Sequence, residues 1–307
     1  MEFTRLPRFN RAIAVQPIQL TERDREIIRL VHRHRFLRSS HVIALIGGAS
    51  QQLLRRLQLL YHHGYLERPR AQLEYFHRGG SHPMVYGLGS KGATFLKQEL
   101  GPAFHEVWSN EQNHSVGTIF LEHALLVSDV MVALELACRK NGRVRLLYGE
   151  DLTIPGGSPK PRPFHWKVKI SGPLRLGVIP DRVFALEFPD QNGVPSRAYF
   201  FLEADRGTMP VKRRKLYQTS FFRKLLAYEA TWSHSIHRTR FGFHRFRVLT
   251  VTTSVTRVES LVNACAQLKR GQGLFLFTDR VSFETSGDVF SLPWHTGRPG
   301  ETVSLLN

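Results

Sequence analysis

The sequence has little cysteine and no long uninterrupted apolar segment. Only two cysteines, Cys138 and Cys265, occur in 307 residues, and both fall in apolar patterns of helical period. This argues against a disulfide framework and against a cysteine-ligated zinc site. No stretch approaches the about 18 consecutive apolar residues of a membrane-spanning helix, and the N-terminus lacks the apolar run of a signal peptide. We therefore expect a protein of the reducing cytoplasm with no membrane partner.

Acidic residues are scarce relative to basic ones. The chain has 25 Asp and Glu against 43 Lys and Arg, which gives a formal net charge of +18. Such an excess indicates a polyanionic partner, nucleic acid first and an anionic membrane surface second. A phosphate-binding P-loop is absent, so ATP-driven work on DNA has no support. The 15 histidines show no spacing that favours a shared metal, which disfavours zinc or histidine-metal chemistry.

The first hundred residues predict a small DNA-binding domain. Residues 1–19 contain arginines and prolines without periodicity, and we interpret them as a basic arm that need not be ordered. Thr21 is a helix N-cap with Asp24 at the capping-box position. Further helices are expected at 39–47, 50–63 and from Ser90, with short strands at 65–67 and 84–88. This order is the layout of a winged helix-turn-helix, which we place at residues 20–100.

The third helix and the wing supply candidate DNA contacts. Arginine can bind phosphates or guanine edges, and glutamine can read adenine. The candidates are Gln51, Gln52, Arg55 and Arg56 on the helix and Arg68, Arg70 and Arg78 on the wing. We expect double-stranded DNA as the partner. Winged helices also bind proteins and often dimerise, so the sequence leaves a protein partner and a homodimer open.

The second half predicts an α/β domain. We place a linker at 101–113, the domain at 114–280 and an irregular tail at 281–307. The expected elements are a long helix at 114–139, a strand at 144–154, a hairpin within 176–206, a helix at 211–233, a strand at 246–252, a helix at 255–268 and a strand at 274–277. The hairpin is where we expect chemistry, because carboxylates interrupt its apolar runs.

Those carboxylates are Asp181 in the first run and Glu203 and Asp205 in the second. Because strand side chains alternate, Glu203 and Asp205 share a face. If Asp181 faces them from the neighbouring strand, the three charges repel unless one is protonated or a cation lies between them. Mg²⁺ prefers such oxygen ligands, and Glu150 is a further candidate ligand. An aspartate beside a proline is also a common turn former, so Asp181 alone does not define a site.

The P-D and E-A-D segments that contain Asp181 and Glu203 resemble the motif of the PD-(D/E)xK, or restriction-endonuclease-like, nucleases. The chain departs from that motif because Asp205 stands where those enzymes have lysine. Some members carry the lysine on the following helix, where Lys224 and Lys215 are the candidates here. The resemblance implies a restriction-endonuclease-like fold for this domain.

The chain as a whole resembles the replication-relaxation family of plasmid and mobile-element proteins. The matching segments are L-T-E-R-D-R-E-I-I-R-L, L-L-R-R-L with L-Y-H-H-G-Y-L, L-E-H-A-L, and P-D-R-V-F followed by F-L-E-A-D-R-G-T. The resemblance covers most residues from 20 to about 280. The family is related to one class of conjugative relaxases with the same nuclease-like core. The resemblance implies action on plasmid DNA in replication, relaxation or mobilization, alongside plasmid replication or mobilization proteins.

Two functions remain open. In the first, Asp181 and Glu203, with Asp205 or Glu150, hold Mg²⁺ (or Mn²⁺ in its place) for phosphodiester cleavage, and Lys224 or Lys215 stabilises the developing charge. A relaxase would also need a nucleophile, commonly tyrosine, for which the chain offers Tyr199, Tyr217 and Tyr228. In the second, the protein is a non-catalytic DNA-binding regulator with a degenerate nuclease fold. Asp205 in place of lysine favours this second function, whereas the retention of Asp181 with Glu203 favours the first.

Overall fold

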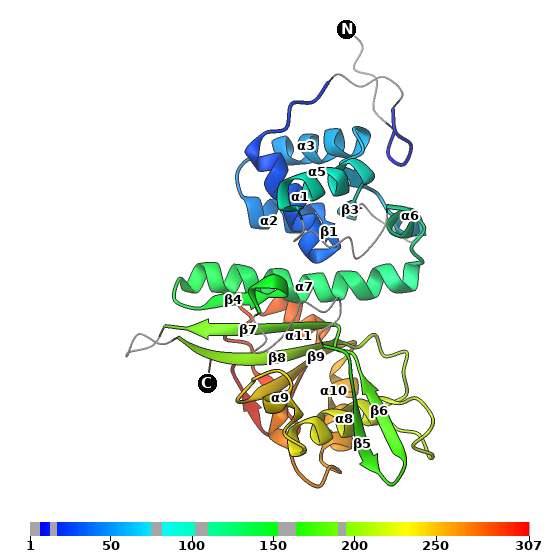
Figure 1. Cartoon of the computed structure of the whole chain (residues 1–307), viewed down its shortest axis with the longest axis vertical. Helices are drawn as coiled ribbons and strands as arrows, with labels where there is room; N and C mark the ends of the chain where they lie inside the picture. Colours follow the sequence, from blue (N-terminus) through cyan, green and yellow to red (C-terminus); the bar gives the residue numbers. More distant parts are fainter. Residues whose placement is uncertain are drawn as a thin grey trace. The chain divides into compact units, whose positions relative to one another are not determined.

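A computed structural model describes residues 7–12, 17–74, 82–101, 110–152, 164–189 and 195–306. The chain divides into two compact units, Met1–Val132 and Ala133–Asn307 (Figure 1). The division falls within helix α7 (Thr118–Asn141) and not at the linker that we placed at 101–113. The reason is that the first half of α7 packs on the first unit, where Leu121 and Leu125 join Phe36 in a buried cluster.

The first unit combines helices with a small antiparallel sheet. Its elements are α1 (Glu22–His34), β1 (Phe36–Arg38), α2 (Ser39–Ile46), α3 (Ser50–His62), β2 (Leu66–Glu67), the 3₁₀ turn η1 (Arg70–Gln72), β3 (Val85–Leu88), α5 (Ser90–Leu100) and α6 (Asn110–His114). The sheet order is β1-β3-β2, and all pairs are antiparallel. The expected hairpin of β2 and β3 is confirmed, whereas β1 is too short for its period to show in the sequence.

Local rules explain where α1 begins. The Thr21 hydroxyl accepts a hydrogen bond from the Asp24 amide at 3.3 Å, and the Asp24 carboxylate accepts one from the Thr21 amide at 2.8 Å. The predicted capping box is therefore confirmed. Ile27, Ile28 and Val31 then lie fully buried on the inner face of the helix.

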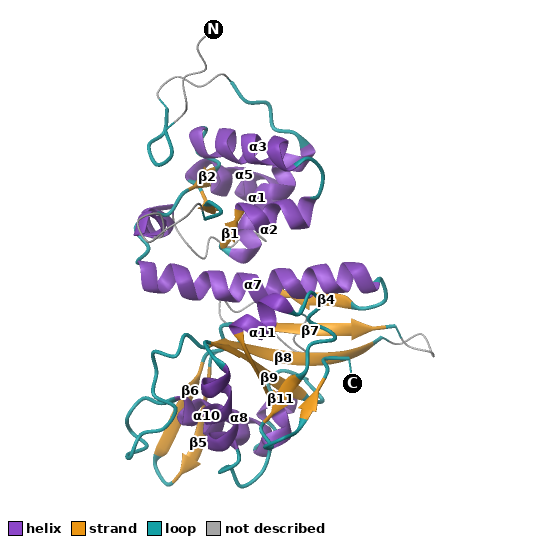
Figure 2. Cartoon of the chain, turned by 180° about the vertical axis from the view of Figure 1, so that it is seen from behind, coloured by secondary structure: helices purple, strands orange, loops and turns teal. Residues whose placement is uncertain are grey.

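The second unit is built on a seven-stranded mixed sheet (Figure 2). Beyond the end of α7, its elements are β4 (Arg145–Tyr148), η3 (Gly149–Asp151), β5 (Trp166–Ser171), β6 (Leu174–Val178), β7 (Arg182–Phe188), β8 (Ser196–Ala204), α8 (Phe221–Ser233), α9 (Ile236–Thr239), β9 (Phe246–Thr252), α10 (Val255–Cys265), η4 (Gln272–Leu274), β10 (Phe275–Asp279), α11 (Arg280–Thr285), β11 (Trp294–Thr296) and β12 (Thr302–Val303). The strand order is β12-β11-β10-β9-β8-β7-β4, and β5 with β6 forms a separate two-stranded ribbon.

The centre of the sheet is parallel and its edges are antiparallel. Strands β8, β9 and β10 run parallel, which requires crossover connections, and the helices α8 and α10 lie in those connections. Strand β7 pairs antiparallel with β8, and β11 with β10. The ribbon and both crossover helices join the core on one face of the sheet, where Trp166, Phe201 and Tyr228 lie buried.

Several expectations for this unit were wrong in detail. The strand expected at 144–154 ends at Tyr148, where a 3₁₀ turn begins. The helix expected at 211–233 begins at Phe221, because the amides of Phe221 and Phe222 donate to the carbonyls of Pro210 and Val211 at 2.9 and 2.8 Å. Four consecutive cations at 212–215 also disfavour a helix there. The tail at 281–307 is not irregular, since β11 and β12 extend the sheet. The apolar run from 176 to 188 is two strands, split at Pro180.

Candidate functional site

The pairing of β7 with β8 brings two carboxylates together. The last register pair is Arg182 with Leu202, and one step further along both strands places Asp181 opposite Glu203. The Asp181 amide donates to the Leu202 carbonyl at 3.0 Å. The Asp181 carboxylate accepts a hydrogen bond from the Ala204 amide at 2.7 Å. Asp181 is thereby fixed at the start of β7, beside the end of β8.

Both carboxylates lie on the face of the sheet that α8 covers. Val183 and Phe201 belong to the core beneath α8. Because alternate residues of a strand share a face, Asp181 and Glu203 lie on that same face. The expected convergence of these two residues therefore agrees with the geometry of the strands.

Helix α8 supplies two partners to Glu203, whose exposed fraction is 2%. The Lys224 ammonium donates to one carboxylate oxygen, and the Tyr228 hydroxyl donates to the other at 2.6 Å. Lys224 and Tyr228 are four residues apart, so they lie on one face of the helix, one turn from each other. Of the two lysines open in the sequence, the structure brings Lys224 to the carboxylates.

The charges of this cluster are strongly coupled. Burial raises the pKa of Glu203, Asp181 raises it further, and Lys224 and Tyr228 oppose them, with a result of about 7. Burial alone would lower the pKa of Lys224, but the negative charges of Glu203 and Asp181 outweigh it and raise that pKa. Burial and the Glu203 charge raise the pKa of Tyr228 well above its ordinary value, so this phenol is neutral at physiological pH.

Asp205 does not join the cluster as a ligand, which corrects the expectation that three acids converge on one cation. Its carboxylate accepts hydrogen bonds from the Thr252 hydroxyl at 2.6 Å and from two nitrogens of Arg257 at 2.9 and 3.3 Å. Arg257 also donates to the Met209 carbonyl at 2.6 Å. With its side chain only 5% exposed, Asp205 forms a structural ion pair that ties β8 to α10.

The other candidates of this unit whose side chains are described, Lys215, Tyr217 and Tyr199, have contacts elsewhere. Lys215 is exposed, and its ammonium lies 5.6 Å from the ring centre of Tyr217. Tyr217 is 69% exposed, and Tyr199 stacks on Phe243 with ring centres 3.9 Å apart. The side chain of Glu150 lies outside the described residues.

The donor chemistry can be compared with what Mg²⁺ requires. Across the described residues, no group of three His, Cys, Asp or Glu could hold a metal ion. Asp181 and Glu203 therefore do not fit an all-protein metal cage. They do fit the common mode in which one or two carboxylates bind Mg²⁺ and a substrate phosphate and waters complete its shell.

Three of the four residues of α3 that we expect to contact DNA are exposed, and the fourth is bound inside the first unit. Gln51, Gln52 and Arg55 are exposed. Arg56 instead donates twice to the fully buried carboxylate of Asp24, and its nitrogen Nε lies 2.9 Å from Asp24 Oδ1. Arg56 thus serves the fold of the first unit, and Arg55 is the cation that α3 offers to solvent.

The expected wing contacts also change. Arg68 is only 5% exposed, because its guanidinium packs over the rings of Tyr61 and Tyr86 and donates to the Tyr86 hydroxyl at 3.0 Å. Its assignment as a phosphate contact is therefore wrong. Arg70 is exposed, and Arg78 lies outside the described residues.

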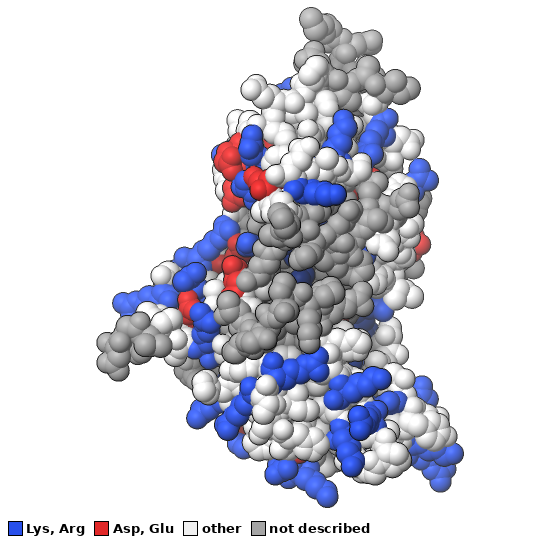
Figure 3. Space-filling view, viewed as in Figure 1, with Lys and Arg blue, Asp and Glu red and all other residues white. Residues whose placement is uncertain are grey.

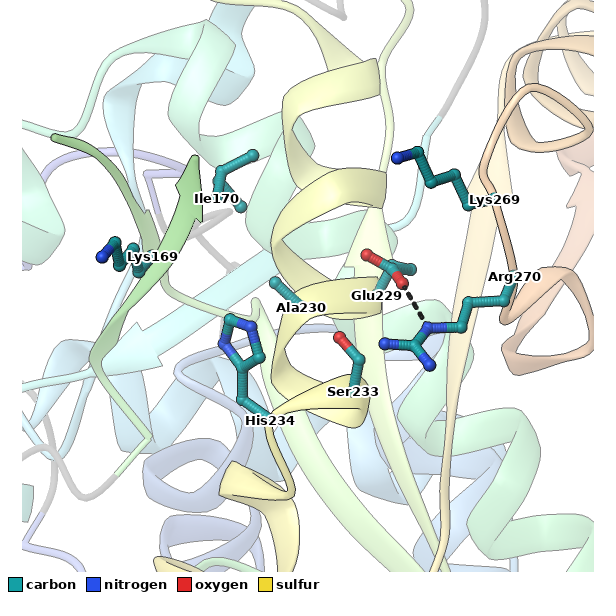
Figure 4. Close-up of a pocket in the computed structure, with 8 residues that line it drawn as sticks. All are labelled: Lys169, Ile170, Glu229, Ala230, Ser233, His234, Lys269 and Arg270. Atoms are coloured by element: carbon teal, nitrogen blue, oxygen red, sulfur yellow. Dashed lines mark hydrogen bonds and ion pairs between the residues drawn. The ribbon is translucent and has the colours of Figure 1, made fainter. Parts of the chain in front are cut away.

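Basic side chains predominate on the face of the second unit that Figure 3 shows. The same unit has a surface cleft of about 430 Å³ at the C-terminal end of α8. Lys169, Lys269 and Arg270 line it, together with the carboxylate of Glu229, which is paired with Arg270 (Figure 4). The residues that line this cleft do not include Asp181, Glu203 or Lys224, so it is distinct from the carboxylate cluster.

Sequence reasoning missed the partners that the fold supplies. The only signal for Tyr228 as a partner of Glu203 is its spacing of four residues from Lys224, and the sequence suggests Tyr228 only as a nucleophile. Arg257 gives no local signal, because it lies 52 residues from Asp205. The ribbon β5–β6 had a signal in its alternating apolar and basic residues.

A comparison with models of protein families shows which family the chain belongs to. The model of the replication-relaxation family matches residues 28–245. The chain belongs to the replication-relaxation family. The match begins within α1 and ends one residue before β9, so the stretch typical of this family contains Asp181, Glu203 and Lys224, whereas Arg257 lies beyond it. This confirms the resemblance inferred from the short segments of the sequence.

Other comparisons add no relative. No curated protein and no solved structure matches the chain. Within the part of the chain that the structure describes, no helix has the length and apolar character to cross a membrane.

Proposed function

We propose that this member of the replication-relaxation family is a DNA-binding protein of plasmid or mobile-element replication, relaxation or mobilization, and that its second unit nicks DNA. The observation that carries the nicking is the position of Lys224. It reaches Glu203 from α8 beside Asp181, and so supplies from a helix the cation that the strand lacks at Asp205.

The roles of the residues follow from their chemistry. Asp181 and Glu203 would hold Mg²⁺, or Mn²⁺ in its place, which when bound polarises a phosphate and lowers the pKa of a water. Lys224 places a positive charge where the phosphate gains negative charge in the transition state. Tyr228 donates to Glu203 at 2.6 Å and so orients that carboxylate.

The first unit would bring the protein to duplex DNA as a winged helix. The three helices α1 to α3 and the antiparallel strands β2 and β3 support this assignment. In a winged helix the third helix enters the major groove, where Gln51 and Gln52 would read base edges and Arg55 would contact a phosphate or guanine. A restriction-endonuclease-like assignment of the second unit is supported by the mixed sheet with carboxylates at the ends of β7 and β8.

A specific observation favours a second function, that of a non-catalytic DNA-binding regulator. The position of the motif lysine is Asp205, which is committed to Arg257. Two carboxylates also remain as metal donors where a self-sufficient site would offer more.

Plasmid nicking decides between the two functions. Supercoiled plasmid would be incubated at about pH 8 with Mg²⁺ or Mn²⁺, where most of Glu203 is ionised. We expect wild type to nick, and Asp181→Asn and Lys224→Met to lose about 100-fold or more of the rate. Lys215→Met is the matched control and keeps the rate. Tight duplex binding by wild type without nicking under either metal would establish the regulator instead.

A further inference from the structure

The ribbon β5–β6 has one apolar and one basic face. Its inward side chains are buried in the core of the second unit: Trp166, Val168, Leu176 and Val178. Its outward side chains Lys167, Lys169 and Arg175 are exposed. The alternation follows from the two-residue period of a strand. The apolar face accounts for the attachment of the ribbon to α8, and the basic face needs another explanation.

In the part of the chain that the structure describes, the cations on this face lack acidic partners. Lys169 lies directly opposite Arg175 in the register of the two strands, and like charges in that position destabilise a sheet. The sequence contains no Asp or Glu from residue 152 to residue 180. Within the described residues, neither these two side chains nor Lys167 makes an ion pair or a side-chain hydrogen bond. A stable fold alone would not select this arrangement, whereas binding to a polyanion would.

The outward face of the ribbon also carries small residues among its cations and is open to solvent. Lys167 pairs with Gly177, and a Cβ atom added at Gly177 would meet no atom within 4 Å. The turn between the strands contains Gly172 and Pro173, which are small. A two-stranded ribbon of this form has the width that a DNA major groove admits.

The ribbon lies next to other cationic surface and next to the carboxylate cluster. Lys169 is at the rim of the cleft shown in Figure 4, with Lys269 and Arg270 on its other side. At its other end, β6 leads through two residues to Asp181. DNA bound along the ribbon would therefore be held beside the residues proposed to act on it.

We propose that the outward face of the ribbon β5–β6 binds double-stranded DNA through phosphate contacts of Lys167, Lys169 and Arg175. This inference rests on the proposed function only in taking DNA as the ligand, because it does not require that the protein cuts. The protein would then have two DNA-binding surfaces, one on the first unit and one on this ribbon of the second unit. The ribbon would bind DNA without regard to base sequence.

The test compares two triple variants of the full chain that lose the same charge. The first is Lys167→Gln, Lys169→Gln and Arg175→Gln. The second, the control, is Lys140→Gln, Arg143→Gln and Arg298→Gln, three exposed cations elsewhere in the same unit. Affinity for a mixed-sequence duplex of about 30 base pairs is measured by fluorescence anisotropy at about 50–300 mM salt, because each phosphate contact adds roughly 0.9 to the slope of log K against log salt.

We expect the ribbon variant to lose about 2–3 in that slope and at least about 10-fold in affinity, and the control to change affinity less than about twofold. A third variant, Lys167→Arg with Lys169→Arg, keeps the charge and should keep the wild-type slope. Thermal melting of all variants confirms that they are folded.

The outcomes separate the two proposals. If wild type binds the duplex and the ribbon variant matches the control, the ribbon is not a DNA-binding surface and the proposed function stands. If wild type does not bind duplex DNA, both proposals fail. A ribbon variant that loses binding to anionic phosphatidylserine vesicles and keeps binding to the duplex would also overturn the inference, and would point to a membrane surface instead.

Discussion

Glu203 is a carboxylate that the fold removes from water and places between neighbours of opposite charge. Asp181 lies across from it on β7, and Lys224 reaches it from α8. The side chain of Lys224 is 36% exposed, so a phosphate from solvent can also reach its ammonium. A partly exposed cation beside two carboxylates suits a site whose substrate is an anion.

The pH dependence of stability tests this pair. The pKa of Glu203 is raised in the folded state, so the folded protein binds a proton that the unfolded chain has released, and stability falls as pH rises from about 4.5 to about 7. In Lys224→Met the carboxylate loses its cation, so this loss becomes larger and extends to higher pH. We expect the cost of Lys224→Met, from urea unfolding, to be small at about pH 5 and about 2 kcal/mol larger at about pH 8.

Lys215→Met is the control for that measurement. Lys215 is exposed, so Lys215→Met should change the unfolding free energy by no more than about 0.5 kcal/mol at both pH values. A cost of Lys224→Met that does not vary with pH would show that Lys224 does not govern the charge of Glu203.

At the scale of residues, the sequence predicted the strands better than the helix. Glu203 and Asp205 could be placed on one face because strand alternation is a local rule. The position of Asp181 opposite Glu203 depends instead on the register between β7 and β8, which the sequence left as a condition. The choice between Lys224 and Lys215 depends on where α8 begins, and that is set by contacts with the loop before it. The partners of Asp205 come from β9 and α10, and such long-range contacts have no signature in the sequence.

Among the elements, the end of β8 is held by a cluster that we define as the Asp205 clamp: Asp205, Thr252, Arg257 and the carbonyl of Met209. It joins β8, β9 and α10 to the loop that follows β8. The clamp gives a structural role to the aspartate at the position where the PD-(D/E)xK motif, which this segment resembles, has lysine. A lysine there would face the Arg257 guanidinium, whereas an aspartate binds it.

Substitutions at Asp205 test whether the clamp is structural. We expect Asp205→Asn to cost about 3 kcal/mol in unfolding free energy, because it leaves a mostly buried arginine without its counter-charge. Asp205→Lys introduces the lysine of the PD-(D/E)xK motif, but it should reduce the unfolding free energy by more than Asp205→Asn does. It should not raise the nicking rate. Urea unfolding provides the measurement, and Asp205→Asn with Arg257→Gln completes a double-mutant cycle with a coupling of about 1–3 kcal/mol. An Asp205→Lys protein as stable as wild type would contradict the clamp.

The elements themselves were predictable where their period was strong. The helices α1, α3 and α10 and the strands β7, β8 and β9 have apolar faces that the sequence shows. The short strands β1, β11 and β12 have two or three residues each, which is too few for a period. They form because a neighbouring strand offers hydrogen-bonding groups, as β10 does for β11.

For the molecule as a whole, the basic residues behind the net charge of +18 have two kinds of role. Some cations are consumed inside the fold, as Arg68 is by aromatic rings and Arg56 by Asp24. Others are left on surfaces, as on α3 and on the ribbon β5–β6. Composition alone cannot separate these uses, which is why Arg56 and Arg68 were assigned to DNA from the sequence.

Two neighbouring arginines on α3 test this division directly. Arg55 is exposed and Arg56 is bound to the fully buried Asp24. Burial acts to raise the pKa of Asp24, but hydrogen bonds from Arg56 and Thr21 outweigh it and the pKa is lowered. Asp24 therefore stabilises the fold above its unfolded pKa, and this contribution is lost as pH falls through the folded pKa.

We expect Arg55→Gln to weaken duplex binding about 5-fold and to reduce the salt slope by roughly 0.9, with stability unchanged. Arg56→Gln should instead cost about 2 kcal/mol of stability at neutral pH, less than a fully buried pair because its side chain is 28% exposed. Where Arg56→Gln is folded, its salt slope should equal that of wild type. Anisotropy titrations and urea unfolding of the two variants give both quantities. Equal effects of the two substitutions on DNA binding would mean that Arg56 leaves Asp24 to bind DNA.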